Sequence, residues 1–237
     1  MKLSAPIFHL KRNAKRLARR QAIGLAEALD QVARAEGYNG WSHLAAQYAA
    51  LSPATKLYGR LEPGDLVLVG ARPGQGKTML ALELAAQAVR HGNRSVFFTL
   101  DYTAKDVLER LGSLAFDPSQ FADLLAFDCS DAICADYIIG QLQTAASGTL
   151  VVVDYLQVLD QSREKPALAL QIAALKSFAR ARGVVIVFIS QIDRSYDPGV
   201  KPYPGLQDVR LPNPLDLSLF NKACFLNNGD IQLQAAD

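Results

Sequence analysis

Several residue types and patterns are scarce in this 237-residue sequence, and each scarcity argues against a class of protein. No apolar run approaches the roughly 18 residues that a membrane-spanning helix needs. The three cysteines (Cys129, Cys134 and Cys224) lack metal-ligand spacing, and their odd number argues against a disulfide framework. The N-terminus lacks the apolar core of a signal peptide. We therefore expect a cytoplasmic protein with reduced thiols and no membrane contact.

The charges are unevenly distributed along the chain. Residues 1–60 carry ten Lys and Arg against three Asp and Glu, whereas residues 61–237 carry fifteen against twenty. Half of the residues are apolar, which is enough for one sizeable core and an appendage. The sequence predicts a basic helical N-terminal domain over 1–52 and a larger domain over 53–237. A basic segment of this kind favours an anionic partner.

The basic segment has the pattern of a small helical bundle. A helix is predicted over 7–21, a second over 25–36 with Leu25, Leu29, Val32 and Ala33 facing inward, and a third near 41–48. Ser52-Pro53 is expected to be a connection. The polar side of the first helix carries six cations, which are candidate nucleic-acid contacts: Lys11, Arg12, Lys15, Arg16, Arg19 and Arg20. The alternatives are a solvated helix face and a docking surface for an acidic protein.

Beyond residue 60, apolar runs alternate with helical patterns. Strands are predicted near 66–70, 95–100, 124–127, 149–154 and 184–190, and helices near 77–91, 103–115, 131–145 and 166–182. Because the strands are continuously apolar, both faces of the sheet are expected to be covered. This pattern predicts an α/β fold with a doubly wound, mainly parallel sheet. A last strand is expected over 223–226, paired with 231–233 through Asn228-Gly229, and 192–214 is too rich in Pro and Gly for regular structure.

A glycine-rich turn joins the first predicted strand to the helix after it. The pattern of small residues followed by Gly-Lys-Thr is that of a phosphate-binding P-loop. Backbone N–H groups can surround a polyphosphate there, Lys77 can reach the β- and γ-phosphates, and the Thr78 hydroxyl can ligate Mg²⁺. The candidate nucleotide-binding residues are Ala71, Arg72, Pro73, Gly74, Gln75, Gly76, Lys77 and Thr78.

Three polar residues follow the ends of other predicted strands. Asp154 ends an apolar strand and is a candidate for holding the metal beside Thr78. Some ATPases place the catalytic base directly after this Asp, but here that residue is Tyr155, which is not an acid. The base must therefore come from elsewhere, and Asp101 is the natural candidate. Asp101 could equally cap the following helix. Gln191 can sense the γ-phosphate or the attacking water.

Four segments together resemble a known family. They are 64–78, with the P-loop, Val96-Phe-Phe-Thr-Leu-Asp101, Val151-Val-Val-Asp-Tyr-Leu-Gln157 and Ile189-Ser-Gln-Ile-Asp-Arg194. Their order and spacing are similar to those of DnaB-type replicative helicases, within the RecA-like ATPases, over roughly residues 56–226. The resemblance implies that ATP and Mg²⁺ are the cofactors and that DNA, single- or double-stranded, is the partner.

The resemblance also implies roles for particular residues. Gln191 would couple the γ-phosphate to the nucleic-acid loops, and Arg110 would approach the phosphates, its alternative being a solvent-facing helix Arg. Asp208-Val-Arg210 resembles the Asp-Leu-Arg that follows the family's DNA-binding loop, so 194–207 would be that loop. Arg194, Lys201 and Arg210 are accordingly candidate nucleic-acid contacts. Assembly of several copies and a helicase or replication partner are further expectations.

Three departures from the family pattern leave two functions open. The family's catalytic Glu is replaced by Asp101, the family's later Lys and Arg (the arginine finger) have no evident counterpart in 227–237, and a head of about 55 residues replaces the helicases' large N-terminal domain. One hypothesis is an ATPase that acts on or with DNA and whose hydrolysis the shorter Asp101 would slow. The other is a nucleotide-switched adaptor or regulator with little hydrolysis and no helicase activity.

Overall fold

The computed structural model describes residues 3–5, 7–114, 116–121, 123–160, 165–211 and 213–235. Contacts between residues divide the chain into two compact units, 1–60 and 61–237. Ala115 and Pro212, which belong to a predicted helix and a predicted loop, lie outside the described residues. Within the described part of the chain, none of the helices has the length and hydropathy of a membrane span.

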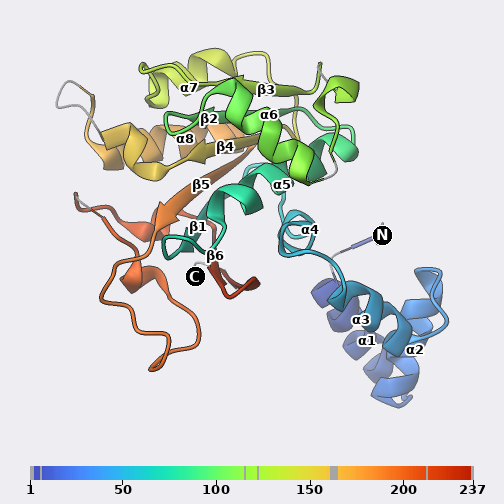
Figure 1. Ribbon diagram of the computed structural model, residues 1–237. Coiled ribbons are helices and arrows are strands. Elements are labelled where there is room, and N and C mark those ends of the chain that lie inside the picture. The colour runs from blue at the N-terminus through green and yellow to red at the C-terminus, as the bar shows by residue number, and fades with distance from the viewer. Residues whose placement is uncertain are drawn as a thin grey trace. The chain divides into compact units, whose positions relative to one another are not determined.

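Unit 1–60 contains the three predicted helices, α1 (Ile7–Gln21), α2 (Leu25–Ala35) and α3 (Trp41–Ala49) (Figure 1). Its small core consists of Leu10, Ala33 and Leu44, with Trp41 and Val32 packed against it. All six cations of α1 are exposed, so the predicted separation of apolar and basic faces is confirmed. The prediction for Leu25 was wrong. It begins α2 and is 44% exposed, and Ala28 is buried instead.

A fourth helix, α4 (Pro53–Tyr58), replaces the connection that we expected at Ser52-Pro53. Ser52 is its N-cap and accepts a hydrogen bond from the Thr55 backbone N–H at 3.2 Å. Pro53 occupies the first turn, where its missing N–H costs no hydrogen bond. The same two residues that suggested a break therefore begin a helix.

Unit 61–237 is built on a seven-stranded sheet in the order β3-β2-β4-β5-β1-β6-β7 (Figure 1). The strands are β1 (Leu66–Ala71), β2 (Ser95–Thr99), β3 (Leu125–Asp128), β4 (Leu150–Asp154), β5 (Val185–Gln191), β6 (Lys222–Asn227) and β7 (Asp230–Ala235). All neighbours pair in parallel except β6 and β7, which form the predicted antiparallel hairpin. At its turn Asn228 and Gly229 have φ values of 50° and 79°, which suit an Asn-Gly hairpin turn.

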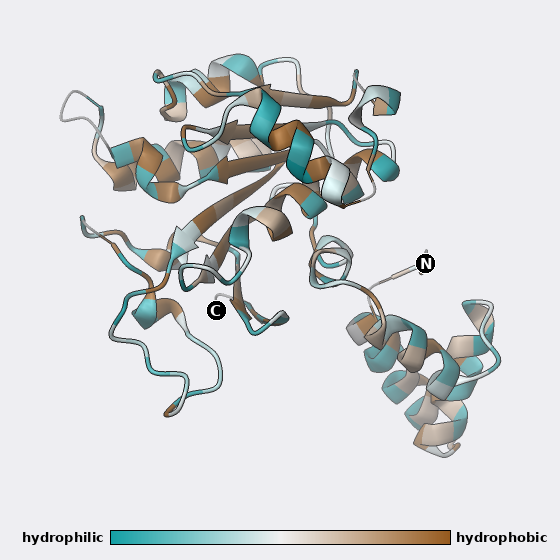
Figure 2. Ribbon diagram, in the orientation of Figure 1, coloured by the Kyte–Doolittle hydropathy of each residue, from teal (hydrophilic) through white to brown (hydrophobic). Residues whose placement is uncertain are grey.

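Helices cover both faces of this sheet, as the continuous apolar strands predicted. The helices are α5 (Lys77–Arg90), α6 (Ala104–Ser113), α7 (Ala135–Gln141) and α8 (Leu168–Arg182). Helix α5 packs on β1, β2, β4 and β5 and contacts α6, whereas α8 packs on β1 and β5 and contacts α7. Leu66, Leu68 and Phe188 share one buried cluster with residues of α7 and α8. The central strands of this sheet are hydrophobic along most of their length in Figure 2.

Two predicted segments differ from the structure. The helix predicted over 131–145 is limited to α7, because turns occupy the residues on either side of it. The segment 192–214 is mostly irregular, as expected, but contains a short 3-10 helix at Leu206–Asp208. An isolated antiparallel bridge between Ile192 and Val209 closes the base of this segment.

Candidate nucleotide-binding site

The turn between β1 and α5 has the backbone of a phosphate-binding loop. Gly74 and Gly76 have φ values of 79° and 81°, a region that residues with a Cβ rarely adopt. Gly76 is the N-cap of α5, so the helix begins at Lys77 and directs its free N–H groups toward the turn. Gly70 is needed for space, because a Cβ there would lie 3.0 Å from side-chain atoms of Ile192 and Phe225.

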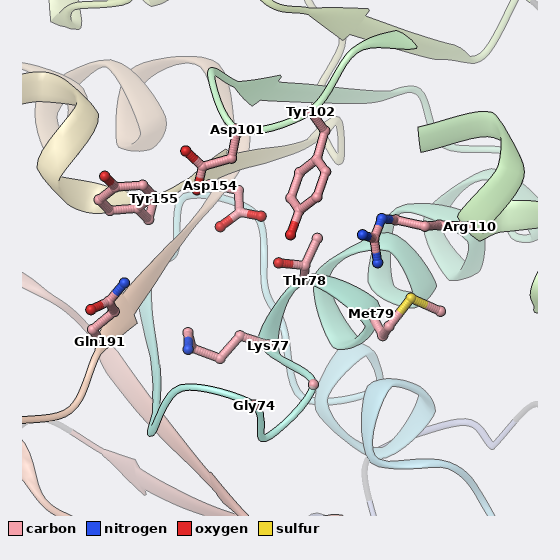
Figure 3. A pocket seen from close by; sticks show the side chains of 11 residues that line it. Gly74, Lys77, Thr78, Met79, Asp101, Tyr102, Arg110, Asp154, Tyr155 and Gln191 are labelled. Carbon is pink, nitrogen blue, oxygen red and sulfur yellow. The ribbon is translucent and has the colours of Figure 1, made fainter. Parts of the chain in front are cut away.

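The sheet order explains why distant residues meet beside this turn. Strands β2, β4, β5 and β1 are consecutive neighbours and parallel, so their carboxyl ends lie along one edge. Register pairs Ala71 with Gln191 and Asp154 with Thr99. A cavity of about 320 Å³ opens at this edge. Its lining includes Gly74, Gly76, Lys77, Thr78, Asp101, Arg110, Asp154 and Gln191, all of them predicted site residues (Figure 3).

Asp154 lies in the middle of this cavity and is 4% exposed. Burial, with the nearby Asp101 charge, raises the pKa of Asp154 to about 6, although a hydrogen bond from Thr78 and the charges of Lys77 and Arg110 oppose the shift. Its Oδ2 atom has no hydrogen-bond partner among the described residues. The peptide bond that follows, to Tyr155, is cis.

The donors at this point fit a magnesium ion. A buried carboxylate oxygen without a partner lies beside the Thr78 hydroxyl, and Mg²⁺ prefers hard oxygen ligands. A divalent cation would also offset the free-energy cost of ionising the buried Asp154 carboxyl group. Asp154 and Thr78 would therefore hold Mg²⁺ together with phosphate oxygens, and the ion would neutralise phosphate charge.

Lys77 is the first residue of α5, and its side chain extends into the same cavity (Figure 3). Burial lowers its pKa, and the charge of Asp154 partly opposes this effect. The Lys77 ammonium donates a hydrogen bond to the Arg72 carbonyl oxygen at 3.2 Å. Lys77 therefore already lies over the phosphate loop, with its charge directed into the site.

The region after β2 supplies Asp101, Tyr102 and Arg110. Thr103, and not Asp101, caps α6, in a reciprocal capping box with Asp106. The Asp101 side chain is consequently free of the capping role that we considered, and its charge helps to raise the pKa of Asp154. The Arg110 guanidinium lies 4.5 Å from the centroid of the Tyr102 ring. This contact orients Arg110 toward the cavity, so it is not a solvent-facing helix Arg.

Tyr102 is a lining residue that the sequence analysis missed. Its ring separates Arg110 from Asp101, and its hydroxyl points into the cavity (Figure 3). The position directly after a strand-end carboxylate is the only sequence signal that could have identified it.

Gln191 connects the cavity to the base of segment 192–209. The Arg210 backbone N–H donates to the Gln191 carbonyl oxygen at 2.8 Å, and the Arg210 guanidinium donates to Gln191 Oε1 at 3.5 Å. Gln157, which follows β4, donates from Nε2 to the Arg210 carbonyl oxygen at 2.8 Å. Two residues of the predicted motifs therefore form hydrogen bonds with Arg210. Sequence reasoning assigned nothing to Gln157.

The remaining predicted residues are placed differently. Ala71 is buried in β1, and Arg72, Pro73 and Gln75 line a neighbouring hollow instead of the main cavity. Among the candidate nucleic-acid contacts, Arg194 and Arg210 are exposed. Lys201 forms an ion pair with Asp208 at 2.8 Å, which partly neutralises its charge.

The sheet order and the glycine-rich turn after β1 give the α/β fold of RecA-like P-loop proteins. A family model described as the DnaB-like helicase C-terminal domain matches residues 45–117. The replicative DNA helicase DnaB of Pasteurella multocida is 25% identical over 218 residues, which cover 78% of this chain and 46% of that protein. A probable plasmid replicative DNA helicase of Chlamydia muridarum is 26% identical over 180 residues, 63% of this chain and 40% of that protein. These matches confirm the resemblance to the ATPase domain of DnaB-type helicases.

Solved structures agree on the fold. The ATPase domain of G40P superposes with a TM-score of 0.59 at 19% identity and covers 79% of this chain and 81% of its own. A DnaB-like replicative helicase, studied with its primase interactions, gives a TM-score of 0.61 at 18% identity over 97% of this chain and 71% of its own. The chain spans about half the length of the curated relatives it matches.

Proposed function

We propose that this chain binds ATP with Mg²⁺ in the cavity beside the P-loop, hydrolyses it, and couples the nucleotide state to DNA. The observation that carries the proposal is the meeting of Lys77, Thr78 and Asp154 with Asp101 and Gln191 at one sheet edge. Catalysis of phosphoryl transfer consists mostly of positioning and charge neutralisation, and these groups supply both.

Each group has a distinct part in the proposed reaction. Lys77 and the N–H groups at the start of α5 would bind the phosphates, while Thr78 and Asp154 would hold the metal. Asp101 would accept a proton from the attacking water, directly or through another water. Arg110 would neutralise phosphate charge from the side opposite Gln191 (Figure 3).

Coupling to DNA would run through Gln191. A γ-phosphate contact that moved the Gln191 side chain would act on Arg210, which is bonded to it, and therefore on the base of segment 192–209. The six exposed cations of α1 would add contacts to DNA phosphates that do not depend on sequence. The similarity to replicative helicases further supports assembly of several copies and work alongside replication proteins, in the cytoplasm.

The experiment is steady-state ATP turnover with and without single-stranded DNA, with Lys77→Ala as the control. Turnover above the control that rises with DNA supports the proposal. Turnover equal to the control would refute hydrolysis. In that case nucleotide binding measured by calorimetry would separate a nucleotide switch from a protein that takes up no nucleotide.

One observation favours the switch as the second candidate. Asp101 places its carboxylate one methylene closer to the main chain than the Glu of the resembled family. Since misplacement by about 1 Å can cost about 10²-fold in rate, ATP could act mainly by being bound.

A further inference from the structure

A row of hollows runs along the outer side of the P-loop. The first has a volume of about 400 Å³, and its walls include Arg72, Pro73, Gln75, Arg194, Asn227 and Asn228. The second, of about 380 Å³, shares Pro73 and Arg194 with the first and adds Arg210 and Gln191. We call these two hollows the outer groove. Gln191 also lines the nucleotide cavity, so the groove begins where that cavity ends.

The outer groove is positively charged. Three arginines line it (Arg72, Arg194 and Arg210), against one acidic residue, Asp193. Asp193 accepts a hydrogen bond from the Ser195 backbone N–H at 2.9 Å. Within the described ranges, neither Arg72 nor Arg194 forms an ion pair. Two cations are therefore available to an anionic ligand.

The walls of the groove are tied together. The Asn228 backbone N–H donates to Gln75 Oε1 at 2.8 Å, which joins the β6–β7 turn to the P-loop. Asn227 Nδ2 donates to the Pro202 carbonyl oxygen at 2.7 Å, which joins the same turn to the segment after β5. These bonds fix the relative positions of the walls before any ligand arrives, which lowers the cost of binding.

The chemistry of the lining selects phosphate groups. Guanidinium groups bind phosphate oxygens in a forked geometry, and side-chain amides add neutral donors. Two neighbouring hollows that share Arg194 offer places for two phosphates of one strand. Hollows of about 400 and 380 Å³ suit the backbone of one strand, whereas a duplex presents its phosphates on a convex surface.

We propose that the outer groove binds the sugar–phosphate backbone of single-stranded nucleic acid, with Arg72 and Arg194 contacting neighbouring phosphates. The inference rests on the proposed function, which it refines by placing the strand against the P-loop itself. Pro73 then separates two anion sites on one turn, the nucleotide inside and the strand outside. The Lys77 ammonium donates to the Arg72 carbonyl oxygen at 3.2 Å, so a phosphate that draws Lys77 away from it would couple the two ligands through Arg72 as well as through Gln191.

The test measures binding of a fluorescently labelled oligo(dT) to the full chain by anisotropy over a series of salt concentrations. Each phosphate contact to a single strand adds about 0.7 to the slope of log affinity against log salt. We expect Arg72→Ala and Arg194→Ala each to reduce the slope by about 0.7. Asn228→Asp, which adds a carboxylate to the groove, should weaken binding by about tenfold at low salt.

Matched controls remove or add the same charge elsewhere. Arg94→Ala removes an exposed cation just before β2, at the opposite edge of the sheet, and Gln143→Glu adds an exposed carboxylate after α7. Both should leave the salt slope at its wild-type value. Thermal unfolding and titration with Mg²⁺ and a non-hydrolysable ATP analogue, performed on every variant, separate loss of the groove from loss of the fold or of nucleotide binding.

The outcomes are distinguishable. If the wild type binds the oligonucleotide but Arg72→Ala, Arg194→Ala and Asn228→Asp behave like their controls, the groove inference is wrong and the proposed function stands. If these variants change nucleotide affinity or stoichiometry but not DNA binding, the groove is a nucleotide subsite and the inference is also wrong. If the wild type binds no DNA, both the DNA part of the proposed function and this inference fail.

Discussion

Replacing Asp154 by Asn should stabilise the fold at neutral pH and, at the same time, impair the proposed magnesium-dependent binding of nucleotide. Asp154 is buried, and its pKa of about 6 in the folded protein exceeds the ordinary value of 3.8. The ionised carboxylate is therefore less stable in the fold than in the unfolded chain. At about 1.4 kcal/mol per pKa unit, the displacement corresponds to about 3 kcal/mol of lost stability at neutral pH.

The sign of the effect fixes its pH dependence. Below pH 4 Asp154 is protonated in the folded state and has no charge to desolvate. As pH rises from about 4 to about 6, the unfolded chain loses its proton first, so the free energy of unfolding falls. Asp154→Asn does not titrate, so its stability relative to the wild type should rise by about 2–3 kcal/mol over this range. Any change that the Asn amide makes to the free energy of unfolding independently of pH does not affect how the difference between the two proteins changes with pH.

Urea unfolding of both proteins, followed by circular dichroism between pH 4 and pH 7.5, measures the difference. Asp106→Asn is a control of opposite sign, because hydrogen bonds from Thr103 lower the pKa of Asp106. The free energy of unfolding of Asp106→Asn should be lower than that of the wild type at neutral pH, and this difference should disappear as the pH falls. A pH-independent difference between Asp154→Asn and the wild type would refute the argument that the fold stores a desolvated carboxylate. A stabilised Asp154→Asn that still bound nucleotide with full magnesium dependence would refute the metal assignment.

Other predictions concern the proposed base Asp101, the glycine-rich turn, Arg110 and the basic helix α1. Asp101→Glu should raise ATP turnover, by up to about 10²-fold if reach limits the reaction, whereas Asp101→Asn should lower it; equal rates for the two would exclude Asp101 as the base. Gly76→Ala should destabilise the fold by about 1–2 kcal/mol in urea unfolding because its φ is 81°, while Gly112→Ala, in the last turn of α6 with open space around it, should stabilise by about 0.5–1 kcal/mol. Arg110→Ala should reduce kcat more than it raises KM for ATP, and a change confined to KM would assign Arg110 to ground-state binding. Reversing the charge of Arg16 and two neighbouring cations of α1 should weaken DNA binding and reduce its salt dependence, and an unchanged salt slope would leave α1 as a solvated face.

The central parallel strands were predictable because they are short, mostly apolar runs. Runs such as Leu150–Val153 can only be buried on both faces, and that condition led directly to helices on both sides. The P-loop was predictable because glycines at two positions with positive φ precede a Lys and a Thr in fixed order. Helix α4 was not predicted, because a proline that breaks one helix begins another, and only the Ser52 cap distinguishes the two cases.

The site was less predictable where tertiary contacts determine the position of a side chain. Parallel register brings Asp101, Asp154 and Gln191 to one edge, and this followed from the strand ends alone. The capping alternative for Asp101 could not be excluded until Thr103 was seen to form the cap. The direction of Arg72 and the contact of Gln157 with Arg210 depend on how segment 192–209 folds back, and no local pattern encodes that return.

Calorimetric titration of the chain with a non-hydrolysable ATP analogue, with and without Mg²⁺, tests the central claim most directly. The account predicts one site per chain whose affinity falls when Mg²⁺ is removed, and no measurable uptake by Lys77→Ala. Uptake that is the same in the wild type and Lys77→Ala, or no uptake by either, would contradict the placement of a nucleotide in the cavity between Lys77 and Asp154.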